Sequence, residues 1–189
     1  MGRSSQADAA RHRDEVVRAT SRLLRERGAE GVSVQEAMSA AGLTHGGFYK
    51  HFASKDELVA SAAGAAFADI EARLDRIAAE TPEGASARTR VIDDYLTVDH
   101  RDRIAEGCAN TALAADAARA GDPALRDAYL AGLRRTVEQL ASLEDGAHTH
   151  ERALQDLVVL VGGLTLARAT AGDPVSEELL AAARDLLNR

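Results

Sequence analysis

Apolar residues recur every three or four positions along most of the chain, which is the spacing of an amphipathic helix. The first stripe predicts a helix over residues 9–27, which Gly28 ends. A second stripe, from Val34 to Ala41, predicts a short helix, and a third predicts a long helix from Lys55 to about Ala79. Runs of β-branched residues are almost absent and prolines number only three, so the pattern predicts an all-α protein.

The same spacing returns in five further segments. Three of them begin with a cap residue followed by proline, a common helix start: Thr81-Pro82, Asp122-Pro123 and Asp173-Pro174. The predicted helices cover residues 83–97, 108–120, 123–143, 149–171 and 174 to the end. Residues 1–8 are predicted to be disordered, and the charged segment 98–106 to be a loop. The expected architecture has about nine helices, in a three-helix head (residues 9–54) and a six-helix body (residues 55–189).

Residues 33–58 pack three helix starts into a short stretch. Ser33 with Glu36, and Ser54 with Glu57, have the spacing of a capping box, in which a hydroxyl and a carboxylate satisfy free backbone amides. Gly42 follows the first short helix, at a turn where glycine adopts a positive φ at least cost. Two short helices joined by such a turn form a helix-turn-helix unit, whose second helix lies in the major groove of DNA.

The second helix of this unit, predicted over residues 44–51, has no acidic residue. It offers hydroxyl, imidazole and ammonium groups, which suit phosphates and base edges. Gly46 and Gly47 each cost a helix about 1 kcal/mol relative to alanine, which indicates that bulk is unwanted where the helix meets a close surface. The alternative is that residues 44–55 are only a packed surface.

The sequences Gly42-Leu43-Thr44, Phe48-Tyr49-Lys50-His51-Phe52 and Ser54-Lys55-Asp56-Glu57-Leu58 resemble the DNA-binding domain of the TetR family of bacterial transcriptional regulators. The spacing of Tyr49, His51, Phe52 and Lys55 is the most specific part of the match. The detailed resemblance covers about residues 11–60, and beyond them only the architecture is similar.

The resemblance implies that Tyr49 and Lys55 contact phosphates, and that His45, Gly46 and Lys50 face bases. Thr44 would cap the helix and touch phosphate. Phe48 and Phe52 would pack in the core of the head. The predicted DNA-contacting residues are Ser33, Gln35, Thr44, His45, Gly46, Tyr49, Lys50, His51 and Lys55.

The net charge of −7 argues against a nucleic-acid binder, but its distribution does not. Residues 1–60 carry a net charge of +1 and the remainder −8, as expected for a DNA-binding head on an acidic body. Cys108 is the only cysteine, so an internal disulfide is excluded; it is either a buried thiol or a redox sensor. The longest apolar run, residues 157–166, is about half the length needed to span a bilayer. We therefore expect a cytoplasmic protein.

The last two predicted helices are apolar enough to pair with a second copy in a two-fold, four-helix interface. The alternative is that both are buried within one monomer. The predicted interface residues are Leu157, Val161, Leu164, Leu179, Ala183 and Leu186.

The body is also expected to hold a mostly apolar cavity for an effector. Because aromatic residues make up only 3% of the chain, a small aliphatic or neutral compound is favoured over a large flat cation. The predicted lining residues are Phe67, Ile70, Leu74, Tyr95, Cys108, Thr111, Leu113, Tyr129 and Leu133.

No catalytic motif, metal-ligand set or cofactor-binding loop is found, so the chain is not expected to be an enzyme or to hold a cofactor. The resulting hypothesis is a homodimeric repressor that a small molecule releases from a near-palindromic operator in double-stranded DNA. Two alternatives stay open. One is an architectural DNA-binding protein without a ligand, and the other is a carrier or enzyme that retains the helix-turn-helix head.

Overall fold

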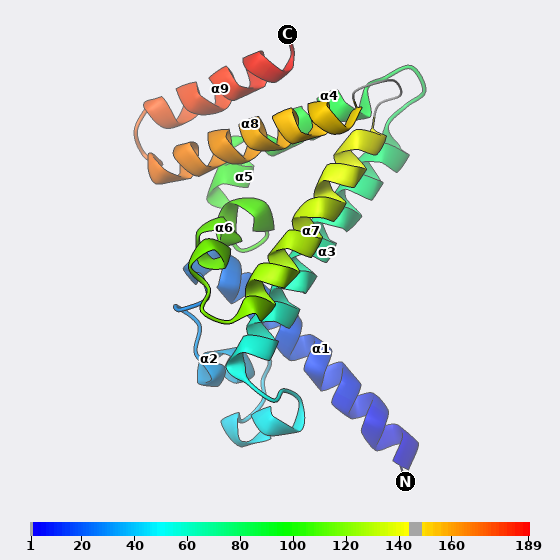
Figure 1. Ribbon diagram of the computed structural model, residues 1–189, viewed down its shortest axis with the longest axis vertical. Coiled ribbons are helices and arrows are strands. Elements are labelled where there is room, and N and C mark those ends of the chain that lie inside the picture. Colours follow the sequence, from blue (N-terminus) through cyan, green and yellow to red (C-terminus); the bar gives the residue numbers. More distant parts are fainter. Residues whose placement is uncertain (1, 144–148) are drawn as a thin grey trace.

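The computed structural model describes residues 2–143 and 149–189, with side chains from Gln6 onward. The regular secondary structure of this part of the chain consists of helices joined by turns and loops, with no strand (Figure 1). The elements are α1 (Gly2–Arg27), α2 (Val34–Ala40), the 3₁₀ helix η1 (His45–Lys50), α3 (Lys55–Glu80), α4 (Ala87–Tyr95), α5 (Val98–Asp102), α6 (Ala109–Arg119), α7 (Pro123–Ser142), α8 (Thr149–Ala169) and α9 (Val175–Leu187). The predicted all-α fold is confirmed.

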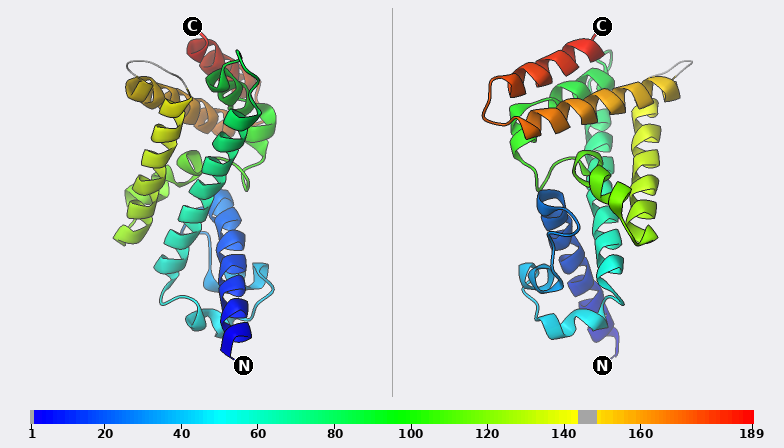
Figure 2. Two further views of the ribbon diagram at one scale, coloured as in Figure 1. Left: turned by 90° about the vertical axis from the view of Figure 1, so that its right-hand side faces the viewer. Right: turned by 60° about the vertical axis from the view of Figure 1, so that its left-hand side comes forward.

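The molecule is elongated, with α1, α2 and η1 at one end and the pair α8–α9 at the other (Figure 1). Helix α3 leaves the head and runs through the body beside α7. Helices α8 and α9 pack against each other across the far end of the α3–α7 pair (Figure 2). Any tilt of α3 would therefore move the head relative to the far end of the body.

Local sequence signals set most helix ends. Ser33 and Glu36 form the predicted capping box, and Asp122 caps α7 with Pro123 at its first position. Gly28 and Gly42 have φ values of +73° and +71°, which are the left-handed conformations that end α1 and the turn after α2.

The buried apolar residues form separate clusters along the molecule. The head cluster buries Phe48 and Phe52, each 2% exposed, which confirms their predicted packing role. In the body, Gly132 of α7 lies so close to the ring of Phe67 on α3 that an added Cβ would collide with it. The absence of a side chain at residue 132 thus permits the close approach of α3 and α7.

Four predicted elements differ from the structure. Helix α1 begins at Gly2 rather than at residue 9, because residues 2–10 contain no breaker after Gly2. Helix α4 begins at Ala87, not after Pro82, because Gly84 has a φ of +83° and Ser86 then caps the helix.

The predicted loop over residues 98–106 contains the short helix α5, since the hydroxyl of Thr97 accepts a hydrogen bond from the His100 amide. The second helix of the helix-turn-helix unit is a 3₁₀ helix, consistent with the poor helix propensity of its two glycines.

A buried ion pair joins three body helices. Arg88 of α4 donates two hydrogen bonds to Asp156 of α8, at 2.6 and 2.7 Å, and a third to the Leu187 carbonyl of α9 at 3.0 Å. Arg88 and Asp156 are 9% and 5% exposed. None of the described helices is long and apolar enough to cross a membrane.

Candidate functional site

The end of the head presents a short polar and cationic segment to solvent. Thr44 is extended at the start of η1, and its hydroxyl forms no cap hydrogen bond. Successive side chains of η1 then point in different directions: Phe48 is 2% exposed, whereas Tyr49 is 78% exposed. An aromatic ring this exposed contributes little to the core, so its phenol is free to contact a partner.

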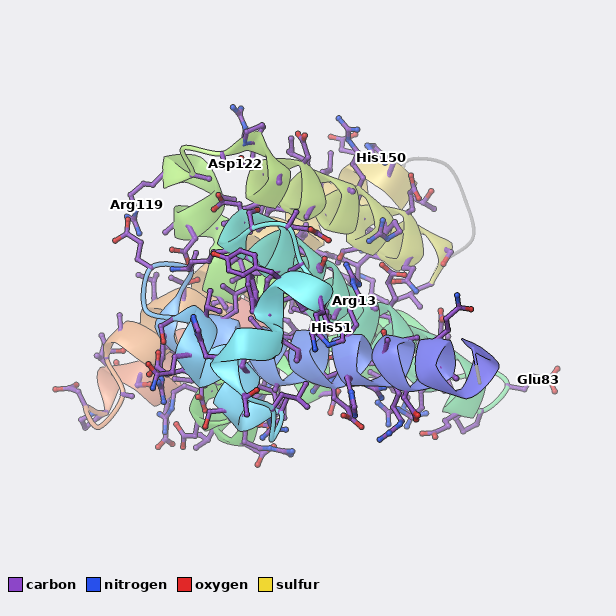
Figure 3. All side chains as sticks on the ribbon, turned by 90° about the horizontal axis from the view of Figure 1, so that it is seen from below. Arg13, His51, Glu83, Arg119, Asp122 and His150 are labelled. Atoms are coloured by element: carbon purple, nitrogen blue, oxygen red, sulfur yellow. The ribbon has the colours of Figure 1, made fainter. Side chains whose placement is uncertain are left out.

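Arg13 of α1 holds this segment in place. Its guanidinium donates to the His51 carbonyl (3.4 Å) and to the Glu57 carboxylate (3.2 Å), and lies 4.8 Å from the Phe52 ring centre. Figure 3, which views the molecule from the head end, shows Arg13 and His51 next to each other. These contacts fix η1 between α1 and the start of α3.

The carboxylate of Glu57 completes the cap of α3. Its Oε2 accepts a hydrogen bond from the Ala53 amide at 2.7 Å, while the Ser54 hydroxyl accepts from the Glu57 amide at 3.1 Å. The bond from Ala53, together with Arg13, lowers the pKa of Glu57. The predicted capping box is thus only half formed: the Ser54 hydroxyl caps α3, but the Glu57 carboxylate accepts from the Ala53 amide instead of the Ser54 amide.

The predicted DNA-contacting residues gather on this end of the head. Thr44, His45, Gly46, Tyr49 and Lys50 are exposed on η1, and Lys50 has no ion pair with any side chain that the structure describes.

Of the other four, only Gln35 is equally exposed and, within the described residues, unengaged. His51 and Lys55 are half-buried, and Lys55 borders a groove that also contains Asp116 and Asp122. On α2, Gln35 is exposed, whereas the Ser33 hydroxyl is engaged with Glu36 and lowers the pKa of that carboxyl.

Inside the body lies a small cavity of about 60 Å³, here named the inner cavity. Its walls come from α3, α4, α5, α6, α7, α8 and the loop before α6. The lining residues are Asp69, Ile70, Arg73, Leu74, Ile77, Val91, Asp94, Tyr95, His100, Glu106, Gly107, Cys108, Asn110, Thr136, Leu140, Leu157 and Leu160.

Of the predicted lining residues, the inner cavity contains Ile70, Leu74, Tyr95 and Cys108. The other five do not line it. Phe67 and Leu113 are fully buried in a separate apolar cluster, while the Thr111 hydroxyl lies 3.1 Å from the Tyr95 hydroxyl. Tyr129 packs against that same cluster, and Leu133 packs against another apolar cluster, formed by α3, α4, α7 and α8. The Cys108 thiol is 4% exposed.

A larger charged cleft of about 660 Å³, the outer cleft, lies between α1, α3 and the α4–α6 region. It shares Asp69, Arg73, Asp94, His100 and Glu106 with the inner cavity, so the two adjoin. Ion pairs span the outer cleft from Arg22 to Glu106, from Arg25 to Asp69 (2.9 Å) and from Arg73 to Asp94 (2.7 Å). The first two connect α1 of the head to the body.

The outer faces of α8 and α9 expose apolar side chains. On α8, Leu154, Val158 and Leu166 are 42%, 71% and 53% exposed, in a row with Gly162, whose added Cβ would meet nothing within 4 Å. On α9, Leu186 is 56% exposed.

The predicted interface residues divide between this outer face and the core of one protomer. Leu157, Leu164 and Ala183 are buried within the protomer, and Val161 and Leu179 are half-buried. Sequence analysis missed Leu154, Val158 and Leu166, because the apolar stripe of α8 extends around most of the helix and does not identify which side faces inward.

The head sequence matches a known family. Residues 16–62 match the family described as "Bacterial regulatory proteins, tetR family". This stretch contains α2, η1 and the turn between them, so the helix-turn-helix unit carries the TetR-family sequence pattern. No curated protein sequence is similar enough to the chain to count as a match.

Beyond the matched stretch, the similarity is one of fold. A TetR-family regulator from Agrobacterium tumefaciens has 17% identity and a TM-score of 0.76, covering 96% of this chain and 98% of that one. NemR of E. coli, in its reduced form, has 19% identity and a TM-score of 0.74, covering 92% and 95%. FadR of Bacillus subtilis, solved with stearoyl-CoA, has 14% identity and a TM-score of 0.66, covering 92% and 96%. The chain thus has the fold of a TetR-family transcriptional regulator.

Two features of the structure, one in the head and one in the body, escape sequence analysis. Arg13 is separated by 38 residues from the His51 carbonyl that it contacts, and no local pattern connects them. His100 falls in a predicted charged loop, yet it is 4% exposed and its Nδ1 lies 2.7 Å from the Tyr95 carbonyl. The Thr97 cap beside it is the one available signal. No group of potential metal ligands occurs among the residues that the structure describes.

His100 makes stability depend on pH. Burial, opposed by the hydrogen bond to the Tyr95 carbonyl, lowers the pKa of His100 to about 4, whereas the unfolded chain titrates near 6.5. Between these values the unfolded state binds more protons, so acidification lowers the free energy of unfolding, by up to about 3 kcal/mol. Between about pH 7 and pH 5, we expect the free energy of unfolding of the parent protein to fall by about 2 kcal/mol more than that of His100→Gln. Urea titrations at the two pH values measure both changes. Parallel pH dependences of the two proteins would contradict this assignment.

Proposed function

We propose that this protein is a homodimeric transcriptional regulator that binds a near-palindromic DNA operator and releases it when a small molecule enters the body. The observation that carries the proposal is the outward presentation of Tyr49 and Lys50 by η1, with Phe48 and Phe52 anchoring the helix from behind. In a helix-turn-helix unit this is the side that enters the major groove. A DNA-binding regulator acts on the chromosome, so the proposal includes a cytoplasmic location.

Within this proposal, the predicted DNA-contacting residues divide by role. Tyr49 and Lys55 hold phosphates, while His45, Gly46 and Lys50 face the bases. In a dimer, the two η1 helices would lie about one DNA turn apart, roughly 34 to 40 Å. The operator would then be a near-palindrome of about 15 to 25 base pairs.

Selection from a random pool of DNA duplexes tests the proposal, because the protein itself then identifies its operator. We expect the full-length protein to enrich a near-palindrome, and its affinity to fall steeply as salt rises. A pool that stays random after selection at low salt would reject a sequence-specific regulator and favour the carrier alternative. If the selected duplexes shared only flexible pyrimidine–purine base-pair steps and no palindrome, the architectural alternative would be favoured.

The dimer is proposed to form through the outer faces of α8 and α9. Leu154, Val158, Leu166 and Leu186 give this region an apolar surface, and Gly162 leaves room for the backbone of a second copy. In a two-fold interface each residue occurs twice, so a single substitution acts twice. Of the six residues predicted from sequence, Val161, Leu179 and Leu186 keep exposed surface for such contacts, while the other three support the face from within.

Val158→Glu is expected to raise the dimer dissociation constant by about 100-fold or more, because two carboxylates would be buried without partners. Sedimentation analysis at matched concentrations measures the change. Leu130→Glu is the control, since Leu130 is another exposed apolar residue (37%), but on α7. Equal dissociation constants for the two variants would exclude this face as the interface.

The effector site is proposed to be the inner cavity, entered from the outer cleft. These spaces favour a ligand-responsive regulator over an architectural protein with a filled body. The structural neighbour FadR was solved with stearoyl-CoA, which supports a ligand-binding role for a protein of this fold. The ion pairs Arg22–Glu106 and Arg25–Asp69 connect the cleft to α1, so a ligand that separates them would shift the head.

A further inference from the structure

Two residues of the inner cavity wall each have a buried hydrogen-bond acceptor without a donor. His100 and Asn110 are 4% and 1% exposed, and both belong to the cavity wall. Within residues 6–143 and 149–189, neither His100 Nε2 nor Asn110 Oδ1 has a hydrogen-bond partner. Buried polar atoms are nearly always paired, so two unpaired acceptors beside one cavity require an explanation.

The imidazole of His100 has a defined tautomer. Its Nδ1 lies 2.7 Å from the Tyr95 carbonyl oxygen, which can only accept a hydrogen bond. Nδ1 therefore carries the proton. Because burial favours the neutral ring, Nε2 keeps its lone pair and acts as an acceptor.

The amide of Asn110 has a defined orientation for a similar reason. The Thr136 hydroxyl donates to the Gly132 carbonyl at 3.0 Å, so only its lone pairs remain to face Asn110. The group that lies 3.4 Å from Thr136 must then be the Asn110 amino group, Nδ2. Oδ1 is thereby left as the unpaired acceptor.

Most other polar groups of the wall already have partners. Arg73 is paired with Asp94, the Asp69 and Glu106 carboxylates are paired with arginines of α1, and the Tyr95 hydroxyl lies 3.1 Å from that of Thr111. Ile70, Leu74, Leu157 and Leu160 supply hydrocarbon surface. The cavity of about 60 Å³ is smaller than one that holds benzene, about 150 Å³, so a bound molecule must be small or must extend into the adjoining outer cleft.

We propose that the inner cavity selects a small neutral effector with an apolar body and at least one N–H or O–H group, which donates to His100 Nε2 or Asn110 Oδ1. This inference rests on the proposed function, because it assigns a chemical class to the effector of that regulator. A carboxylate has only acceptor atoms and would face two lone pairs, so acids are disfavoured in this cavity. Ligands of the same shape that lack a donor would leave both acceptors unpaired.

Pyrrole and furan form a matched pair of probes. Both are five-membered aromatic rings of nearly the same size, but pyrrole carries an N–H donor and furan only an oxygen acceptor. Binding to the full-length protein without DNA is followed by NMR of labelled Ile and Leu methyl groups, including those of Ile70, Leu74 and Leu157. We expect pyrrole to bind about tenfold more tightly than furan at these methyls, and propanoate to bind more weakly than either.

Variants assign the preference to the acceptors. Asn110→Leu removes Oδ1 while keeping the number and branching of the side-chain heavy atoms, and is expected to reduce the pyrrole preference to about threefold or less. Gln139→Leu is the matched control, because Gln139 Oε1 is also buried without a partner but the residue is absent from the cavity wall. This control should keep the full preference.

Equal affinities of pyrrole and furan for the parent protein would overturn the proposal, even if Asn110→Leu did not fold. So would tighter binding of propanoate, or shifts confined to methyls away from the cavity. The duplex selection is independent of these results. A pyrrole preference with no selected DNA sequence would refute the regulator alone, whereas a selected operator without a pyrrole preference would refute only the effector class.

Discussion

Tyr49→Phe is expected to weaken binding to the selected operator by about 10- to 30-fold, since each of two protomers loses one hydrogen bond to phosphate. The substitution removes only an oxygen from a side chain that is 78% exposed, so the fold should be unaffected. Gel-shift titrations with the operator and with unrelated duplexes measure the effect. Because phosphates are the same in every sequence, affinity should fall by a similar factor for both.

Tyr129→Phe is the matched control. It makes the same chemical change in the body, where the Tyr129 hydroxyl donates to the Asn110 carbonyl, and should leave DNA affinity unchanged. An operator affinity of Tyr49→Phe within about twofold of the parent would reject the phosphate role.

Lysine substitutions separate phosphate contacts from base contacts in the same segment. Lys55→Ala should weaken binding to all duplexes by a similar factor. It should also reduce the slope of log binding constant against log salt concentration by about one per protomer. Lys50→Ala should instead change which sequence is selected. Identical selected sequences for Lys50→Ala and the parent would remove Lys50 from the set that reads bases.

Arg88→Met is expected to lower the free energy of unfolding by about 3–5 kcal/mol, the largest stability loss expected among these substitutions. The variant leaves the Asp156 carboxylate 5% exposed and without its two hydrogen bonds, and also frees the Leu187 carbonyl. Urea titrations at equal protomer concentration measure the change, because dimerisation contributes to the apparent stability.

The double variant Arg88→Met, Asp156→Leu is the informative control. Removing both charges should restore most of the lost stability, because a buried ion pair and an apolar pair of similar volume often contribute nearly equally to the free energy of unfolding. Arg11→Met, which breaks solvent-exposed pairs with Asp8 and Glu15, should change stability little. A loss for Arg88→Met as small as that for Arg11→Met would show that the buried pair contributes little to stability.

Sequence patterns predict the head better than the body. Ser33–Glu36 and Gly42 are found where expected, because caps and turns act over three or four residues. The burial of Phe48 and Phe52 and the exposure of Tyr49 agree with what the family resemblance implies. Neither source finds Arg13, whose contacts with His51 and Glu57 join residues far apart in the chain.

The cavity is predicted only in part, for a physical reason. Ile70 and Leu74 line it because one face of α3 is apolar, and that periodicity is visible in sequence. His100 and Asn110 are missed, since a polar residue on a predicted loop or helix start is ordinarily solvated. Their burial depends on how α5 and α6 pack against α3 and α7, which the sequence does not express locally.

By itself, the sequence determined the helices, most of their ends, the helix-turn-helix unit and the charge of its exposed segment, because these follow from interactions between neighbours along the chain. Only the tertiary structure decided which side of α8 faces outward, which residues enclose the inner cavity, and which charges pair across helices, as Arg88 does with Asp156 over 68 positions. Those features depend on the relative placement of distant helices, and many different placements satisfy the same local pattern of apolar and polar residues.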